Sequence, residues 1–168
     1  MEQNYKELLE KIKCFIFDVD GVLTSGKLLI SDQGTLLRSM NVKDGFAMKY
    51  ALSRGYSLCI ISGGTNEGVR ERLKTLGITD VYLGINDKVE VLDEYLDIYG
   101  ISRSEVAYMG DDIPDVYPMK EVLLPTCPQN AVPEVKRLAK YISHKNGGEG
   151  CVRDLIEQVL KTQGKWAI

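Results

Sequence analysis

Two aspartates, Asp18 and Asp20, stand directly after the apolar run Cys14-Phe15-Ile16-Phe17, and Gly21 follows them. Side chains two positions apart in an extended chain point to the same side, so we expect both carboxylates on one side of a sheet edge. Like charges held together in a half-buried position are unfavourable unless they share a cation or a proton. The pair therefore indicates a site that uses negative charge.

Further polar side chains stand at the ends of later apolar runs. Ser62 follows the run 57–61, and Lys88 opens a predicted helix. Three more aspartates follow the run 106–109, and these are Asp111, Asp112 and Asp115. Acids gathered at one rim repel one another unless a hard cation with oxygen ligands offsets their charge, and Mg²⁺ also bridges to phosphate. The pattern predicts a Mg²⁺ site that handles a phosphate group.

These residues need a scaffold of alternating strands and helices, and the sequence provides one. Apolar runs predict strands at 14–17, 57–61, 81–83, 106–109 and 122–124. Amphipathic segments with caps predict helices at 4–12, 44–54, 66–76, 87–99, 131–140 and 151–162. Repeated units of this length predict an α/β fold with a doubly wound, mainly parallel sheet. Ligands bind such sheets beyond the carboxyl ends of the strands, where the strand order reverses, so the polar strand ends belong at that edge.

One segment interrupts this alternation. Two extended limbs, 27–30 and 35–42, surround the turn Ser31-Asp32-Gln33-Gly34 and predict a small β-hairpin insert at about residues 26–42. We expect residues 1–168 to form one domain that carries this hairpin and ends in a C-terminal tail, 163–168.

The composition narrows the classes of partner. The chain has 168 residues and a formal net charge of −3, which gives no reason to expect nucleic acid or an anionic membrane as a partner. No run is long enough for a transmembrane helix, and the N-terminus lacks the apolar core of a signal peptide. The four cysteines are scattered without CxxC spacing, which favours reduced thiols in a cytoplasmic protein.

Four motifs now carry a family resemblance. They resemble, in the same order, the motifs of the haloacid dehalogenase superfamily of phosphotransferases. The four motifs are Asp18-x-Asp20-Gly21-Val22-x-Thr24, Ser62, Lys88 and Gly110-Asp111-Asp112-x-x-Asp115. The resemblance implies the Rossmann-like sheet of that superfamily. Asn41-Val42-Lys43-Asp44-Gly45, the stretch 147–154 and Gln163-Gly164-Lys165-Trp166 resemble one family within it, the 3-deoxy-D-manno-octulosonate 8-phosphate phosphatases. That family hydrolyses a sugar-acid phosphate in lipopolysaccharide inner-core synthesis.

The chemistry of the residues agrees with a phosphatase. We expect Asp18 to attack phosphorus and form an aspartyl-phosphate, and Asp20 to act as general acid and then as general base. Ser62 and Gly63 would hold the phosphoryl oxygens together with Lys88, whose charge would stabilise the transition state. The single histidine, His144, makes histidine-based chemistry less suitable than carboxylates.

The metal ligands are expected to be Asp18, Asp111 and Asp20, the last through its backbone carbonyl as the resemblance implies. Asp112 and Asp115 would orient metal-bound waters or Lys88. Mn²⁺ and Co²⁺ are alternatives to Mg²⁺ that the residues do not separate.

The substrate and the assembly rest on the resemblance. The hairpin is too small to seal a site alone, and the similar phosphatases are homotetramers whose hairpins and tails complete neighbouring sites. Lys43 and Arg72 are candidates for binding the carboxylate of a sugar acid, with Arg153 or Lys165 as further candidates.

Three alternatives stay open. Many octulosonate phosphatases carry Arg where this chain has Gly64, which leaves a nine-carbon 2-keto-3-deoxy sugar acid 9-phosphate as a rival substrate. A signalling receiver domain also uses aspartate, Mg²⁺, a hydroxyl and a lysine, but it needs no counterpart of Asp20. The third alternative is a non-catalytic regulatory scaffold of the same fold, and the complete set of motifs argues against it.

Overall fold

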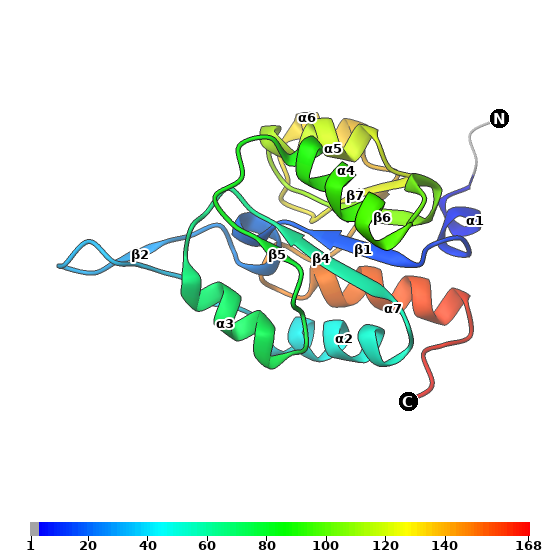
Figure 1. The fold of residues 1–168 in the computed structure, drawn as a ribbon, viewed down its shortest axis with the longest axis horizontal. Helices are drawn as coiled ribbons and strands as arrows, with labels where there is room; N and C mark the ends of the chain where they lie inside the picture. Colours follow the sequence, from blue (N-terminus) through cyan, green and yellow to red (C-terminus); the bar gives the residue numbers. More distant parts are fainter. Residues whose placement is uncertain (1–3) are drawn as a thin grey trace.

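A parallel six-stranded sheet runs through the centre of the molecule, in the order β5-β4-β1-β6-β7-β8 (Figure 1). The computed structural model describes residues 4–168. The middle strand, β1 (Cys14–Phe17), pairs in parallel with β4 (Ser57–Ile61) on one side and with β6 (Val106–Met109) on the other. The strand order therefore reverses at β1, and the predicted doubly wound parallel sheet is confirmed.

The central strands are buried on both faces because their side chains alternate between two hydrophobic layers. Phe15 and Phe17 of β1 belong to one cluster, whereas Cys14 and Ile16 belong to the other. The first layer is built by α1 (Tyr5–Leu9), α2 (Val42–Ser53), α3 (Glu67–Thr75) and α7 (Cys151–Thr162). The second is built by α4 (Lys88–Tyr99), α5 (Val116–Lys120) and α6 (Pro133–Leu138), on the opposite side of the sheet in Figure 1.

Short polar residues begin most of the helices that the sequence predicted. Asn4 caps α1, Asn66 caps α3 and Asp87 caps α4, each through its side-chain oxygen. The predicted helix 4–12 is shorter than expected, since α1 ends at Leu9. Asp44 does not begin α2 as expected, because Asn41 caps this helix and Asp44 lies within its first turn.

Several elements on the β6 side differ from the prediction. The strand expected at 122–124 is β7 (Leu124–Cys127), which begins two residues later and contains Pro125, a residue that interrupts the usual strand pattern. The short helix α5 contains Pro118 and was not predicted. Edge strand β8 (Tyr141–Ile142) was also missed, because two residues are too few to show an alternating pattern. The remaining strand, β5 (Val81–Tyr82), lies at the opposite edge.

The hairpin between β1 and α2 projects from the body of the protein (Figure 1). Its strands, β2 (Leu29–Ile30) and β3 (Leu36–Leu37), are shorter than the predicted limbs 27–30 and 35–42. Large apolar side chains on both strands are exposed, with Leu29 at 68% and Ile30 at 67%. The hairpin thus presents an apolar surface that its own chain leaves uncovered.

The tail after α7 folds back on α2. The Trp166 ring meets the Tyr50 ring edge-on at 5.1 Å between centroids, and Lys165 Nζ lies 4.8 Å from the centre of the Tyr56 ring. The division into one domain, 1–168, with a hairpin and a tail stays a prediction, and its residues 1–3 lie outside the described residues.

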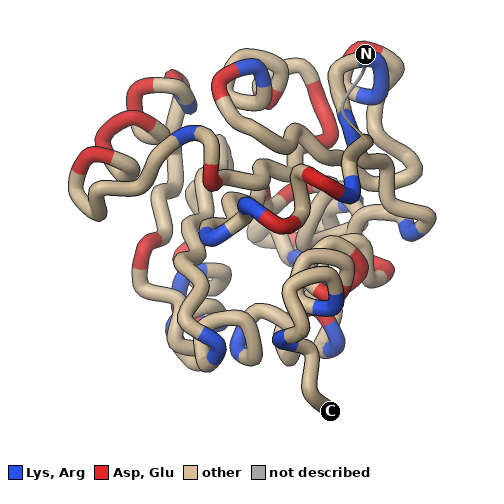
Figure 2. Tube along the Cα trace, turned by 90° about the vertical axis from the view of Figure 1, so that its right-hand side faces the viewer, with Lys and Arg blue, Asp and Glu red and all other residues tan. Residues whose placement is uncertain are grey.

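Acidic and basic residues are both spread along the chain rather than separated into two faces (Figure 2). Cys14, Cys59, Cys127 and Cys151 are free thiols and all four are buried. Within residues 4–168, no helix has both the length and the apolar character that crossing a bilayer requires.

Candidate active site

A cavity of about 490 Å³ opens where the central strands end. Because β1, β4 and β6 are parallel and in register, Asp18, Ser62 and Asp111 emerge at the same edge of the sheet. The cavity is lined by Asp18, Asp20, Gly26, Ser62, Gly63, Gly64, Ile85, Asn86, Lys88, Asp111, Asp112, Pro114 and Asp115. The structure thus brings together the three polar strand ends that the sequence singled out and Lys88 at the start of α4.

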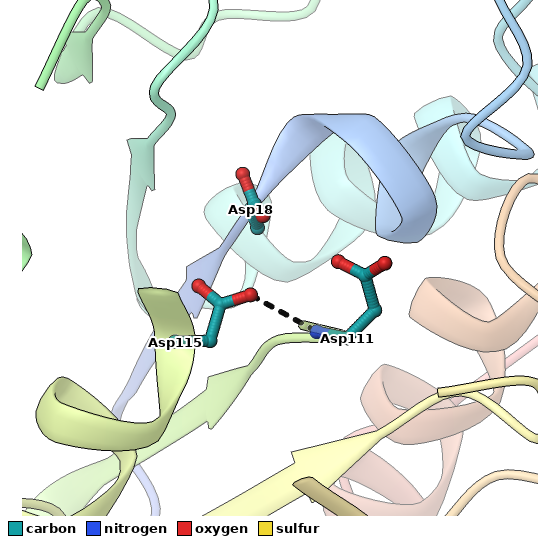
Figure 3. Close-up of side chains that lie close together, drawn as sticks. All are labelled: Asp18, Asp111 and Asp115. Carbon is teal, nitrogen blue, oxygen red and sulfur yellow. Dashed lines mark hydrogen bonds between the residues drawn. The ribbon is translucent and has the colours of Figure 1, made fainter. Parts of the chain in front are cut away.

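Three carboxylates converge in this cavity. Asp18, Asp111 and Asp115 each place an oxygen within 4.8 Å of the other two, and Figure 3 shows their side chains pointing toward one another. Asp18 follows β1, Asp111 follows β6, and Asp115 ends a short helical turn (Ile113–Asp115) that leads into α5. The carboxylate of Asp115 joins those of Asp18 and Asp111 in this group, although the predicted ligand set did not include it. A part for Asp20 as a ligand through its backbone carbonyl stays a prediction.

Lys88 is the cation that faces this group. Its Nζ lies 2.8 Å from Asp115 Oδ1 and 3.2 Å from Asp18 Oδ2, and its side chain is only 5% exposed. Burial acts to lower the pKa of Lys88, but the charges of Asp18 and Asp115 outweigh burial and raise it. Lys88 therefore stays an ammonium ion, with its charge aimed at the acids.

Asp18 is held at the end of β1 by the turn that follows it. Its Oδ1 accepts a hydrogen bond from Val19 N at 2.7 Å, which leaves Oδ2 facing Lys88. Burial is the main cause that raises the pKa of Asp18 well above its ordinary range, and the charge of Asp115 adds to it, while Lys88 opposes the rise. One ammonium does not balance three carboxylates, so the group still lacks positive charge.

Asp115 is fully buried and organises its neighbours. It accepts hydrogen bonds from Lys88 Nζ, from the Tyr108 hydroxyl at 2.9 Å and from Asp111 N at 3.0 Å. Gly110 makes this arrangement possible, because a Cβ at that position would lie 2.3 Å from Asp115 Cβ. The carboxylate thereby fixes both the lysine and the backbone that carries Asp111.

Asp111 provides the test of whether a metal ion fits. Its Oδ1 is buried and has no hydrogen-bond partner among the described residues. Burial, and then the charges of Asp115 and Asp112, raise the pKa of Asp111 to about 7. A buried carboxylate oxygen without a partner, beside two further carboxylates, matches the oxygen ligands that a hard divalent cation takes. Mg²⁺ therefore fits these residues.

Gly21 lets the Asp111 carboxylate come close to the turn that follows β1. It has a φ of +89°, and a Cβ there would lie 1.9 Å from Asp111 Oδ2. The strand ends at Phe17, and a tight turn over Val19–Leu23 follows, in which Asp20 and Gly21 have non-helical backbone angles. The backbone is therefore not a continued strand from Asp18 to Asp20, but both side chains line the same cavity, which agrees with the expectation that they lie on one side of the sheet edge.

Asp20 is paired with Arg38, a residue that the sequence analysis missed. Arg38 Nε donates to Asp20 Oδ1 at 2.7 Å and Nη2 donates to Oδ2 at 3.1 Å, so both carboxylate oxygens are held. The Arg38 side chain is 8% exposed although it follows the exposed strand β3. No local motif marks it, and the available signal was a single cation in the second limb of the hairpin, 35–42.

Ser62 and the two glycines after it form the wall of the cavity beyond β4. The Ser62 hydroxyl oxygen accepts a hydrogen bond from Gly64 N at 3.1 Å, which shapes the tight turn after the strand. A side chain at position 64 would start 3.2 Å from Asp20 Oδ2 and 3.3 Å from Arg38 Nη2. The Arg38 guanidinium therefore lies beside the place where a longer residue 64 would enter the site.

Asp112 lines this cavity, whereas Arg72, Lys43 and His144 lie outside it. Asp112 is exposed and its carboxylate accepts from Ile113 N at 2.7 Å. Arg72 lines a neighbouring cavity of about 400 Å³ that Arg38 also borders, and Lys43 lines a third cavity beside α7. His144 is exposed beside Asp154. A role for Lys43 or Arg72 in substrate binding stays a prediction.

Comparison with known proteins gives consistent results. Residues 84–155 match the haloacid dehalogenase-like hydrolase family. The chain is 36% identical over 156 residues to the 3-deoxy-D-manno-octulosonate 8-phosphate phosphatase KdsC of Salmonella typhi. The aligned region covers 93% of this chain and 83% of that protein.

Solved structures agree with the sequence comparison. The 3-deoxy-D-manno-octulosonate 8-phosphate phosphatase of Yersinia pestis superposes with a TM-score of 0.94 at 32% identity, over 97% of this chain and 88% of that one. The enzyme of the same name from Moraxella catarrhalis was solved in complex with a magnesium ion, a phosphate ion and KDO. It superposes with a TM-score of 0.94 at 32% identity, over 99% of this chain and 95% of that one.

Proposed function

The chain belongs to the haloacid dehalogenase-like hydrolases, in the family of KdsC phosphatases, and from this we propose that it hydrolyses 3-deoxy-D-manno-octulosonate 8-phosphate to the free sugar acid and phosphate. The observation that carries the proposal is the convergence of Asp18, Asp111 and Asp115 with Lys88 at the end of β1. The reaction would use Mg²⁺ and serve the synthesis of the lipopolysaccharide inner core in the cytoplasm.

Asp18 is the nucleophile in this proposal. One of its oxygens attacks phosphorus, the bond between phosphorus and the sugar oxygen breaks, and an aspartyl-phosphate forms on Asp18. The carboxylates of Asp18 and Asp111, together with the backbone carbonyl of Asp20, would hold Mg²⁺. The ion would neutralise charge on the phosphoryl group, which otherwise repels an attacking carboxylate.

Asp20 moves the protons. In the first step it gives its proton to the leaving sugar oxygen, and in the second it takes a proton from the water that attacks the aspartyl-phosphate. Phosphate then leaves and Asp18 returns to its free carboxylate. The pair with Arg38 fixes the direction in which the Asp20 carboxylate points. Because both carboxylate oxygens accept hydrogen bonds from Arg38, one of these bonds has to be released before Asp20 carries the proton that it gives to the leaving group.

Lys88, Ser62 and Gly63 would hold the phosphoryl oxygens. The ammonium of Lys88 is fixed by Asp115, so its charge stands ready for the transition state without rearrangement. Asp115 acts in this proposal by orienting Lys88 and the backbone of Asp111.

The sugar acid would be enclosed by more than one subunit. We propose a homotetramer in which the exposed apolar side chains of β2 and β3 pack between copies, and in which tails 163–168 help to complete neighbouring sites. Arg72 and Lys43 would then meet the carboxylate of a substrate. Sedimentation analysis of the protein would test the assembly, and a monomer at working concentration would refute it.

A nine-carbon 2-keto-3-deoxy sugar acid 9-phosphate is the second candidate substrate. The observation that favours it is Gly64, which leaves the site beside Asp20 and Arg38 without a side chain at this position. This chain therefore lacks the guanidinium that many octulosonate phosphatases carry at this position.

The test is a phosphate-release assay with Mg²⁺ over the eight-carbon and nine-carbon sugar-acid phosphates, simple sugar phosphates and para-nitrophenyl phosphate. We expect the highest kcat/KM for the eight-carbon substrate and none for the Asp18→Asn protein. Higher kcat/KM for the nine-carbon substrate would assign that function instead. A chain that hydrolyses none of them would be a scaffold, and one that keeps a stable phosphoryl group would be a receiver.

A further inference from the structure

The turn that carries Asp18 and Asp20 is braced from behind by a glycine loop that precedes α7. Gly148 N donates to Val22 O at 2.9 Å, and Gly147 packs so closely that a Cβ on it would lie 1.9 Å from Gly21 O. A Cβ on Gly148 would lie 2.5 Å from Ser25 N. The backbone of this loop and that of the nucleophile turn are therefore in direct contact, with no side chain between them.

The same loop leads into α7, whose first turn has no capping side chain of its own. The residue before the helix is Gly150, with a φ of +108°, so no side chain is available to accept the first N–H groups. Asp44 supplies the acceptor from another helix. Its Oδ1 accepts a hydrogen bond from Arg153 N at 2.8 Å, although Asp44 belongs to the first turn of α2.

Asp44 is an unusual residue to bury without a role in the chemistry. It is 1% exposed, and its Oδ2 has no hydrogen-bond partner among the described residues. Burial raises the pKa of Asp44 to about 6, opposed by the N–H and the charge of Arg153. Burying a carboxylate in such surroundings lowers the stability of the folded protein unless its interactions offset the cost. Here the offsetting interaction is the cap that Asp44 provides at the start of α7.

Two further contacts join the starts of α2 and α7 to the glycine loop and to the nucleophile turn. Asn41 Nδ2, at the cap of α2, donates to Gly148 O at 3.3 Å, and Cys151 Sγ, the first residue of α7, lies 3.3 Å from Val22 O. The start of α2 and the start of α7 thus hold Gly148 and Val22 together. Losing the Asp44 cap would loosen the start of α7 and, with it, the support of Asp18 and Asp20.

We propose that Asp44 is a positioning residue for the phosphatase reaction, which fixes the nucleophile turn through the start of α7 and the loop Gly147–Gly148. The inference rests on the proposed function for its activity test, but it makes a structural claim that can be tested separately. Asp44 does not line the cavity and cannot contact the substrate there. We therefore expect its replacement to change kcat rather than KM.

The experiment compares Asp44→Ala with Asp44→Asn and a matched control, using Mg²⁺-dependent hydrolysis of para-nitrophenyl phosphate. We expect Asp44→Ala to lower kcat by about 10-fold to 100-fold, since small displacements of reacting groups have effects of this size, with KM unchanged within about twofold. Asp44→Asn keeps an oxygen that can accept from Arg153 N and should stay within about threefold of wild type. The control, Val159→Ala, removes a buried side chain near the C-terminal end of α7 and should lower Tm but not kcat.

Hydrogen exchange provides a readout that needs no activity. In Asp44→Ala we expect faster exchange of the Gly148 amide and of the peptide over residues 18–25, with unchanged exchange in β7 and α6. Unchanged exchange in the nucleophile turn would overturn the inference whether or not the protein proves to be a phosphatase. So would a wild-type kcat in Asp44→Ala, or an equal loss of kcat in Val159→Ala.

A second variant covers the case in which Asp44→Ala does not fold. Gly148→Ala disturbs the same contact from its other end, because the added Cβ meets the Ser25 backbone. It should lower kcat in the same range, and a kcat within about twofold of wild type would refute the positioning role.

Discussion

Removing the charge of Asp111 should make the metal-free protein more stable and the enzyme inactive. The pKa of Asp111 rises from 3.8 to about 7 in the folded protein, so the folded state holds this proton more tightly than the unfolded state. The free energy of unfolding of the metal-free protein therefore falls as the pH rises from about 4 through about 7, and stays low above that. Asp111→Asn abolishes this loss because an amide does not ionise.

The size of the effect follows from the change in pKa. At about 1.4 kcal/mol per pKa unit, a rise from 3.8 to about 7 corresponds to about 4 kcal/mol at pH 8. Asp111 is only partly buried and solvent screens its charge, so we expect Asp111→Asn to be more stable by about 2–4 kcal/mol at pH 8. At pH 5 the difference should shrink to about 1 kcal/mol, because most of the change in ionisation lies above that pH.

Urea unfolding in EDTA at pH 5 and pH 8 measures this difference, and the same unfolding in Mg²⁺ tests the other half of the argument. Mg²⁺ should stabilise the wild type and not the variant, since ligand binding adds to stability only where the site is intact. Turnover of Asp111→Asn should fall by about 100-fold or more. Asp112→Asn, an exposed carboxylate one residue away, is the control and should shift the free energy of unfolding by less than about 0.5 kcal/mol.

The reasoning fails if Asp111→Asn is no more stable than wild type in EDTA at pH 8. It also fails if the gain in stability does not grow between pH 5 and pH 8. Either result would mean that burial and the charges of Asp115 and Asp112 do not raise the pKa of Asp111 in the folded protein as far as about 7.

Three further changes have distinct expected outcomes. Asp18→Asn should keep the fold by circular dichroism and lose turnover, because an amide does not attack phosphorus, and turnover near the wild-type rate would disprove its role as nucleophile. Arg38→Ala removes both hydrogen bonds to Asp20 and should lower kcat by about 10-fold to 100-fold, with the pH–rate profile as the measurement and Arg38→Lys as the control that keeps the charge. Deleting residues 163–168 removes the contact of the tail with Tyr50, so Tm should fall slightly. The kcat/KM should fall for the sugar-acid phosphate but not for para-nitrophenyl phosphate, and unchanged kcat and KM would show that the tail has no part in the reaction.

Local patterns in the sequence were enough to predict the central sheet. Strands β4 and β6 have the bounds that their apolar runs predicted, and α7 has those of its amphipathic pattern. Period and capping operate within a few residues, so they are visible in one dimension. The prediction failed where proline interrupted the pattern, at β7 and α5, and where β8 was too short to show one.

The candidate site divides in the same way. The sequence by itself determined that Asp18, Ser62, Lys88 and Asp111 meet, because parallel strands in one sheet bring their carboxyl ends to one edge. The pairing of Arg38 with Asp20 was decided only by the tertiary structure, since it depends on how the hairpin folds back across the turn after β1.

The contact between Asp44 and the start of α7 joins residues 109 positions apart. The hydrogen bond from Gly148 to Val22 also joins residues that are far apart in the sequence. No periodicity or cap signal reports on such distant pairs, because their geometry is set by how whole helices pack on the sheet. The sequence thus determined which groups supply the chemistry and at which edge they gather. The tertiary structure decided which other residues hold those groups in place, because that depends on the close packing of segments far apart in the chain.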